Sequence, residues 1–202
     1  MKKNVLSIIL IFVLTTQVLS HIGHYQDFNS LEYELFRNNK LIGYHKYKFK
    51  KEEDKLKVKS IIDFKITKLG VDLYKYNATS EEEYKKDQLI KFSSKTYQNK
   101  KVKNTEIKFD TKKDKLIITG SENQLTSPKE YPVGTWWNHE IVQAKAQISA
   151  ISGRIIMQKV TFVGKEQINL YGKDYEALRF NFSSSDINLP EKKKTEYGCL
   201  VR

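Results

Sequence analysis

The sequence predicts a mainly β protein built on a single large, strongly curved antiparallel sheet, an open half-barrel, with one short helix. Three observations support this: apolar and polar residues alternate along many long segments, short charged turns separate these segments, and one segment breaks the alternation. A period of two places successive side chains on opposite faces of a strand. Short turns favour hairpins and therefore a meander. A large sheet with one apolar face must curl to cover that face.

The N-terminal segment has the layout of a secretory signal peptide and lies outside the predicted fold. Two lysines precede an almost unbroken apolar run over residues 5–14, and Val18 and Ser20 occupy the −3 and −1 positions of a cleavage site. The apolar run is too short to span a bilayer comfortably, which favours a cleaved peptide over an uncleaved anchor. We therefore predict a signal peptide over residues 1–20, cleavage after Ser20, and a periplasmic protein with a single secreted β-rich domain over residues 21–202.

The strands then follow in chain order. Residues 31–35 and 41–49 alternate apolar and polar positions on either side of an Asn-Asn-Lys turn. The clearest strand covers residues 55–66, where Leu56 and Val58 begin an apolar series at even positions while lysines fill most odd ones. A helix would place Leu56 and Val58 on different faces, so a helix is excluded here. The same alternation predicts further strands at residues 71–76, 89–97, 102–109, 116–119, 155–163, 167–171 and 175–182.

One region interrupts this pattern with a loop and a helix. Residues 120–134 contain two prolines and predict an ordered loop. Over residues 138–148 apolar residues recur at helical spacing, and Asn138 is a good N-cap residue. Trp137 and Val142 are placed to form a hydrophobic staple. We therefore expect one short helix here, docked against the open side of the sheet.

Composition and charge exclude several classes of protein. The chain has 202 residues, of which 39% are hydrophobic, so it is long and apolar enough to build a core. A single Cys excludes an intramolecular disulfide framework and a Cys-rich zinc site. The formal net charge of +12 comes mainly from Lys spread over nearly every strand and turn, whereas nucleic-acid readers favour clustered Arg. We interpret this charge mainly as the solvated face of the sheet and expect no nucleic-acid partner.

The most informative stretch for function is residues 131–140, where both tryptophans adjoin an Asn, a His and a Glu. A Trp offers a flat apolar face and one donor, and polar neighbours orient a ligand, so the pattern predicts a ligand-binding rim. The alternative is structural: Trp137 staples the helix, Trp136 fills the core and Asn138 caps. The candidate ligand-binding residues are Trp136, Trp137, Asn138, His139 and Glu140.

Recognisable catalytic motifs are absent from the sequence. It contains no G-x-S-x-G nucleophile elbow, no phosphate-binding loop, no dinucleotide glycine fingerprint and no H-E-x-x-H zinc motif. His139 and Glu140 are adjacent, so on a helix their side chains point in different directions, which argues against a paired acid and base. We therefore predict no catalytic residue, no metal site and no cofactor.

Four short motifs are similar to those of a known family. Tyr33-Glu34-Leu35-Phe36 and Ile42-Gly43-Tyr44-His45 resemble the first hairpin of a family of secreted proteobacterial β-rich proteins catalogued only as a domain of unknown function. Trp136-Trp137-Asn138 is similar to that family's Trp-Asn motif, and Ser152-Gly153-Arg154 to its following Gly turn. The resemblance implies a periplasmic single-sheet fold and carries no activity. It also implies a shortened C-terminus, because residues 197–202 look like a compressed form of the family's closing hairpin.

Two functions from different classes remain open. The leading hypothesis is a non-catalytic periplasmic module that encloses an apolar or amphipathic ligand, such as a lipid, or binds an envelope partner. The alternative is an envelope hydrolase, or a protein that binds an anionic polymer or lipid surface, through His139, Glu140 and nearby lysines. The denser lysine clusters are Lys100-Lys101-Lys103, Lys112-Lys113-Lys115 and Lys192-Lys193-Lys194.

Overall fold

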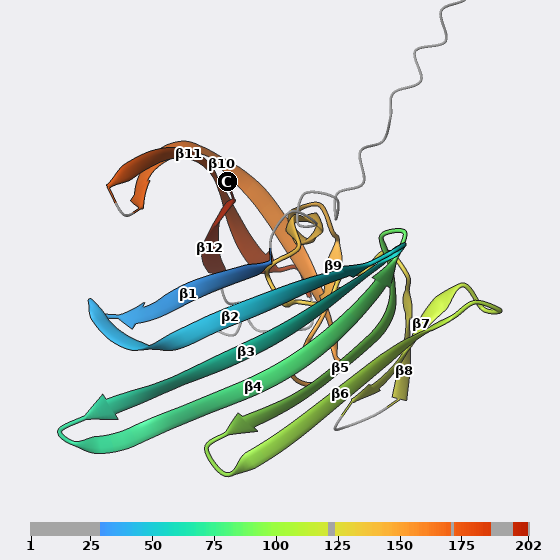
Figure 1. Cartoon of the computed structure of the whole chain (residues 1–202), viewed down its shortest axis with the longest axis horizontal. Helices are drawn as coiled ribbons and strands as arrows, with labels where there is room; N and C mark the ends of the chain where they lie inside the picture. The colour runs from blue at the N-terminus through green and yellow to red at the C-terminus, as the bar shows by residue number, and fades with distance from the viewer. Residues whose placement is uncertain (1–28, 121–123, 171, 187–195, 202) are drawn as a thin grey trace, which may run out of the picture.

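The computed structural model describes residues 29–120, 124–170, 172–186 and 196–201, which form two antiparallel sheets (Figure 1). The larger sheet is a meander of eight strands in sequence order, and the smaller sheet has four strands in the order β12-β11-β10-β9. The predicted mainly β class and antiparallel meander are therefore confirmed. The strands are β1 (Ser30–Arg37), β2 (Lys40–Glu52), β3 (Lys55–Lys68), β4 (Val71–Lys85), β5 (Gln88–Gln98), β6 (Lys101–Asp110), β7 (Lys115–Gly120), β8 (Gln124–Pro128), β9 (Ala146–Ile148), β10 (Ile155–Leu170), β11 (Lys173–Ser184) and β12 (Glu196–Val201).

Tight turns set the register of the long hairpins. Asn38 and Asn39, between β1 and β2, both have positive φ, and so do Lys86 and Asp87 between β4 and β5. Two-residue turns of this kind match the right-handed twist of the strands they join. The register that follows places Val58 of β3 beside Phe49 of β2 and Glu82 of β4. One face of the sheet therefore carries the apolar series that the sequence predicts, and we call it the inner face.

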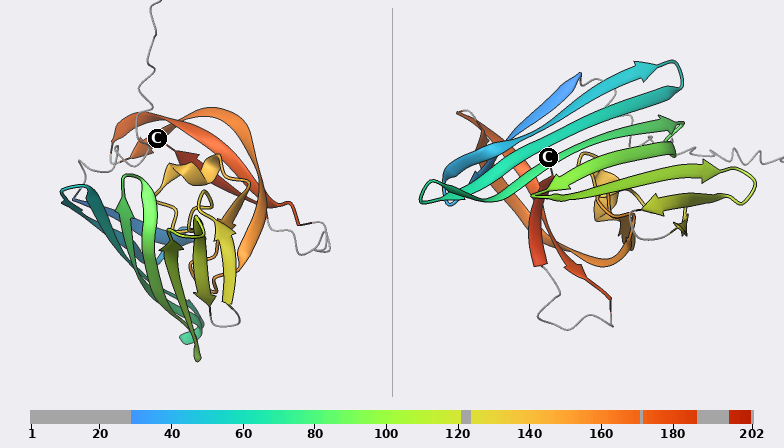
Figure 2. Two further views of the ribbon diagram at one scale, coloured as in Figure 1. Left: turned by 90° about the vertical axis from the view of Figure 1, so that its right-hand side faces the viewer. Right: turned by 90° about the horizontal axis from the view of Figure 1, so that it is seen from below.

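The predicted strong curvature is wrong, because the larger sheet is neither closed nor strongly curled. A separate part of the chain covers the inner face instead: residues 131–154, which we call the cover segment. Its residues Val133, Trp137 and Ile148 join the hydrophobic core formed by side chains of β2 to β7. In Figure 2 the cover segment lies between the larger sheet and the β10–β11 hairpin. The prediction of a single sheet is also wrong, because the last strands form a second one.

The predicted helix over residues 138–148 is reduced to one 3-10 turn, η2 (His139–Val142). Asn138 does cap it, since its side-chain oxygen accepts a hydrogen bond from the backbone N–H of Glu140 at 3.0 Å. The chain then leaves helical geometry because Ala146–Ile148 pairs with β10, and the N–H of Ile148 donates to the carbonyl of Pro132. Strand pairing therefore satisfies backbone groups that a helix would have bonded internally.

Two other boundaries differ from the sequence prediction. The predicted loop over residues 120–134 contains β8, which pairs with β7, while residues 121–123 lie outside the described chain. The two strands predicted at residues 155–163 and 167–171 form the single strand β10, which ends at Leu170, and residue 171 lies outside the described chain. Its register shifts between Phe162 and Gly164, so an irregularity, and not a chain reversal, interrupts the alternation.

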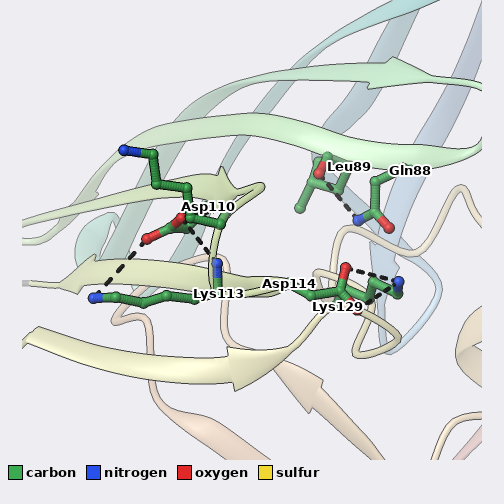
Figure 3. Close-up of polar contacts among 7 residues, drawn as sticks. Gln88, Leu89, Asp110, Lys113, Asp114 and Lys129 are labelled. Atoms are coloured by element: carbon green, nitrogen blue, oxygen red, sulfur yellow. Dashed lines mark hydrogen bonds and ion pairs between the residues drawn. The ribbon is translucent and has the colours of Figure 1, made fainter.

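Several lysines have carboxylate partners on the surface. The Nζ atom of Lys129 donates to both carboxylate oxygens of Asp114 at 2.8 Å, and Lys113 lies 3.9 Å from Asp110 (Figure 3). Asp110 also accepts hydrogen bonds from the backbone N–H groups of Lys112 and Lys113, which fixes the turn after β6. Exposed pairs of this kind add little stability. They do show that the lysine cluster at residues 112–115 is partly neutralised.

Candidate functional site

A cleft of about 420 Å³ lies between the inner face of the larger sheet and the cover segment. The sheet contributes small polar side chains together with apolar and aromatic ones, and the cover segment and β10 supply the opposite wall. The sheet residues are His45, Ser60, Ile62, Tyr76, Ala78, Thr79, Ser80, Ser94 and Thr96. The opposite wall is formed by Gly134, Thr135, Trp136, Gln147, Ser149, Ala150, Ile151 and Ile156.

Trp136 is the large aromatic side chain of this wall. Its backbone has a φ of 69°, a left-handed conformation that is uncommon outside glycine. The side chain is 41% exposed, and its ring contacts Phe182 of β11 edge-on at a centroid distance of 5.3 Å. Trp136 therefore connects the cleft to the smaller sheet while leaving much of its indole surface uncovered.

Trp137 points instead into the core and is only 2% exposed. Its ring packs edge-on against Phe49 at 5.5 Å and Tyr84 at 5.6 Å. Its Nε1–H donates to the carboxyl of Glu82 at 2.9 Å, and the Tyr84 hydroxyl donates to the same carboxyl at 2.7 Å. Trp137 therefore has the structural role that the sequence analysis kept as the alternative.

Glu82 is the buried carboxyl at the centre of these contacts. Burial raises its pKa above the usual value, while hydrogen bonds from Tyr84, Trp137 and Thr135 act in the opposite direction. Burial and the neighbouring carboxyl likewise raise the pKa of the Tyr84 hydroxyl well above its usual range. The group joins β4 to the cover segment, and this connection gives it a structural role.

One of the lining residues is a histidine that is neutral at neutral pH. His45 is half-buried, and burial lowers its pKa to about 4. Its Nδ1 atom lies 3.2 Å from the Tyr47 hydroxyl, which in turn donates to the carbonyl of Thr135. Tyr47 therefore links His45 to the cover segment. The Nε2 atom of His45 is shielded from solvent and has no hydrogen-bond partner in the described chain.

The remaining predicted residues lie elsewhere. Asn138 is buried as the cap of η2, and its amide donates to the Glu140 carboxylate at 3.2 Å. Both residues line a separate hollow of about 260 Å³, beside Tyr84. His139 is half-buried in η2. Of the five candidate residues, the structure thus places only Trp136 in the cleft wall and does not bring the five into one site.

The sequence analysis missed the sheet side of the cleft. The signal in the sequence that could have indicated this side of the cleft is a row of small polar residues at inner-face positions. Ser60, Ser80 and Ser94 pair across three adjacent strands. The hydroxyls of Ser60 and Ser80 are 3.0 Å apart, and Ser94 donates to the carbonyl of Ala150 in the cover segment. Ser60 interrupts the even-numbered apolar series of residues 55–66, and this interruption marks where the face changes from core to cleft.

Within the described ranges, no group of three or more His, Cys, Asp or Glu side chains is placed to hold a metal ion. The same part of the chain contains no helix long and apolar enough to cross a membrane.

Comparison with known proteins gives one match. The profile of a family described as a domain of unknown function, DUF6134, matches residues 33–197. No curated protein and no solved structure shows significant similarity to the chain.

Proposed function

Because the chain belongs to the DUF6134 family, a domain of unknown function, we propose its function from the structure: it is a binding module that holds an apolar or amphipathic ligand in the cleft. The observation that carries this proposal is the half-exposed indole of Trp136 on the cleft wall, held by a strained backbone. Exposed aromatic surface in a concave site is typical of ligand binding. The cleft volume of about 420 Å³ lies within the range of small-molecule sites.

Replacing Trp136 by Ala tests this function. We expect Trp136→Ala to weaken binding of N-phenyl-1-naphthylamine, an uncharged fluorescent amphiphile, by about tenfold or more, because the largest apolar contact is lost. Fluorescence titration measures the dissociation constant, and native mass spectrometry of gently purified protein shows any ligand that co-purifies. Phe162→Ala is the matched control, because Phe162 is an aromatic residue that is 55% exposed and does not line the cleft. Equal affinities of the wild-type protein and the Trp136→Ala variant would remove the cleft as the site.

Export to the periplasm belongs to the same proposal. It is supported by the sequence of residues 1–20, in which two lysines precede an apolar run and small residues occupy the expected cleavage site. These residues lie outside the described chain. We also propose that the chain is one of a group of secreted proteobacterial β-rich proteins, and the Trp136-Trp137-Asn138 motif supports this proposal. Mass spectrometry of the exported protein tests the proposal, with cleavage after Ser20 as the expected result.

A second candidate function is contact with an anionic lipid surface of the envelope, at the end of the larger sheet where β3 turns into β4. Leu69, Val71 and Leu73 are exposed there, and Lys100 and Lys101 line a hollow of about 750 Å³ beside Leu73. Exposed apolar side chains next to lysines are the combination that binds anionic membranes.

Charge reversal at this end tests the second function. We expect the double variant Lys100→Glu/Lys101→Glu to bind phosphatidylglycerol vesicles about tenfold or more weakly than the wild type, since each basic residue near such a surface contributes about 1 kcal/mol. Co-sedimentation measures the bound fraction. Lys112→Glu/Lys113→Glu makes the same change of charge at the opposite end of β6 and is expected to have the smaller effect. Equal losses in the two variants would show a general charge effect and contradict this site.

A further inference from the structure

Two lysines of β6 stand beside the cleft on the inner face of the larger sheet. The strands β4, β5 and β6 are neighbours, and directly opposite residues of an antiparallel pair project from the same face. Two rows of side chains cross these strands, each ending in a lysine: Tyr76-Gln98-Lys101 and Ala78-Thr96-Lys103. Because Tyr76, Ala78 and Thr96 line the cleft, each lysine ends a row that begins in the cleft wall.

The cleft itself is uncharged at neutral pH, whereas its neighbours on this face are basic. Its described lining contains no Lys, Arg, Asp or Glu, and its histidine, His45, is neutral. At the inner-face positions of β3 to β6, which the structure describes throughout, the only carboxyl belongs to Glu82, and that group is buried in the core. Lys101 is exposed, Lys103 is half-buried, and neither forms an ion pair with a carboxylate of the described chain. The positive charge beside the cleft is therefore uncompensated on this face.

We propose that the cleft binds an anionic amphiphile, with its apolar chain in the cleft and its carboxylate or phosphate head beside Lys101 and Lys103. This inference rests on the proposed binding function and names its ligand class. Trp136, Ile62 and Ile156 supply aromatic and aliphatic surface for the chain. A charged head inside the cleft would lose hydration without gaining a counter-charge, so it stays at the rim. There the two ammonium groups attract an anion and repel a cation.

Four probes of equal chain length test the sign of the head charge: decanoate, decyl phosphate, decylammonium and 1-decanol. Each is titrated as a monomer at neutral pH, and displacement of N-phenyl-1-naphthylamine gives its dissociation constant. We expect at least one anion to bind about tenfold or more tightly than decylammonium, and the tighter anion identifies the head. Equal affinities of anions and cation, or a preference for the cation, overturn the inference, while displacement by 1-decanol leaves the binding function standing. If neither N-phenyl-1-naphthylamine nor any of the four probes binds, both proposals fail.

A double variant of the two lysines tests the position of the head. Lys101→Gln/Lys103→Gln removes both charges and keeps long polar side chains, so the preferred anion should bind about three- to tenfold more weakly, and 1-decanol within about twofold of the wild type. The matched control is Lys91→Gln/Lys108→Gln, because these two lysines are opposite each other across β5 and β6 on the other face of the sheet. The control should bind the anion like the wild type. Equal losses in the two double variants, or no loss in either, overturn the site.

Lys103→Gln alone separates this site from the second candidate function. Lys101 also lines the hollow beside Leu73, and Lys103 does not. We expect the single variant to bind the anion about threefold more weakly and phosphatidylglycerol vesicles within about twofold of the wild type. Far-UV circular dichroism checks that all these variants fold. If Lys103→Gln weakens vesicle binding as much as it weakens anion binding, Lys103 serves a membrane surface and the inference fails.

Discussion

The Trp137→Ala variant is expected to lose about 3–5 kcal/mol of unfolding free energy, the range for removing a large buried aromatic side chain. Trp137 is 2% exposed, packs edge-on against Phe49 and Tyr84, and is a donor to the buried Glu82 carboxyl. Its loss opens a cavity beneath the cover segment and removes one of the donors that keep Glu82 satisfied. Because whole domains are stable by only about 5–15 kcal/mol, much of the fold's stability depends on this one side chain.

Urea unfolding followed by far-UV circular dichroism measures the loss independently of Trp fluorescence. The matched control is the neighbouring Trp136→Ala, which removes the same atoms from a site that is 41% exposed. We expect it to cost no more than about 2 kcal/mol, since its burial is incomplete. Equal losses in the two variants would contradict the division between a structural and a binding tryptophan.

The second large effect is expected at Glu82. Glu82→Leu replaces the carboxyl with an apolar side chain of similar size and leaves the Trp137 Nε1–H and the Tyr84 hydroxyl without their acceptor. Each orphaned buried donor costs about 1–3 kcal/mol, so the loss of both acceptor contacts should cost about 2–6 kcal/mol. Glu82→Gln is the control, because its amide oxygen still accepts from Trp137 and the Tyr84 hydroxyl can accept from the new amide. If the Leu variant is as stable as the Gln variant, the hydrogen bonds to Glu82 do not hold the cover segment.

Comparison of the wild type with Glu82→Gln reveals how the Glu82 carboxyl makes the free energy of unfolding depend on pH. Burial raises the pKa of Glu82 in the folded state, so above the ordinary value the folded protein holds a proton that the unfolded chain releases. The wild type should therefore lose stability relative to Glu82→Gln as pH rises through that window. His45 has the opposite sign, because its folded pKa of about 4 lies below the ordinary 6.5 and stability rises with pH between the two values. Urea unfolding of both proteins at about pH 5 and about pH 8 isolates Glu82, because His45 is common to both.

The sequence was most informative where one periodic signal decided the structure. The alternation of Leu56, Val58 and their even-numbered neighbours predicts β3 because a half-buried strand needs just that pattern. Curvature has no such local signal. Whether an apolar face curls on itself or is covered depends on what the rest of the chain supplies, and here Val133, Trp137 and Ile148 supply the cover. The helix prediction failed for the same reason, since tertiary pairing of Ala146–Ile148 with β10 overrides apolar spacing.

The candidate site was only partly accessible from the sequence. The two tryptophans drew attention to the correct segment, but nothing local showed that Trp136 faces the cleft and Trp137 the core. That difference follows from the positive φ of Trp136. A positive φ is uncommon outside glycine, so the presence of a Trp at this position does not predict it. From the sequence, His45 between Tyr44 and Tyr47 is interpreted as a half-buried strand residue, and the structure places it so on β2. Its position in the cleft depends on the cover segment, where Thr135, 88 residues beyond Tyr47, accepts a hydrogen bond from the Tyr47 hydroxyl.

The meander and its cover also imply an order of folding. Each strand from β1 to β8 pairs with its neighbour in sequence, so the larger sheet assembles through short loop closures. The contacts that close the core join distant parts of the chain. The Trp137 indole donates a hydrogen bond to Glu82, 55 residues earlier, and the Thr135 carbonyl accepts one from Tyr47, 88 residues earlier. We therefore expect docking of the cover segment to be the slow, entropically expensive step of folding. Before that step the apolar face of the larger sheet would be exposed, and we expect the lysine charge to oppose association of separate chains in that interval.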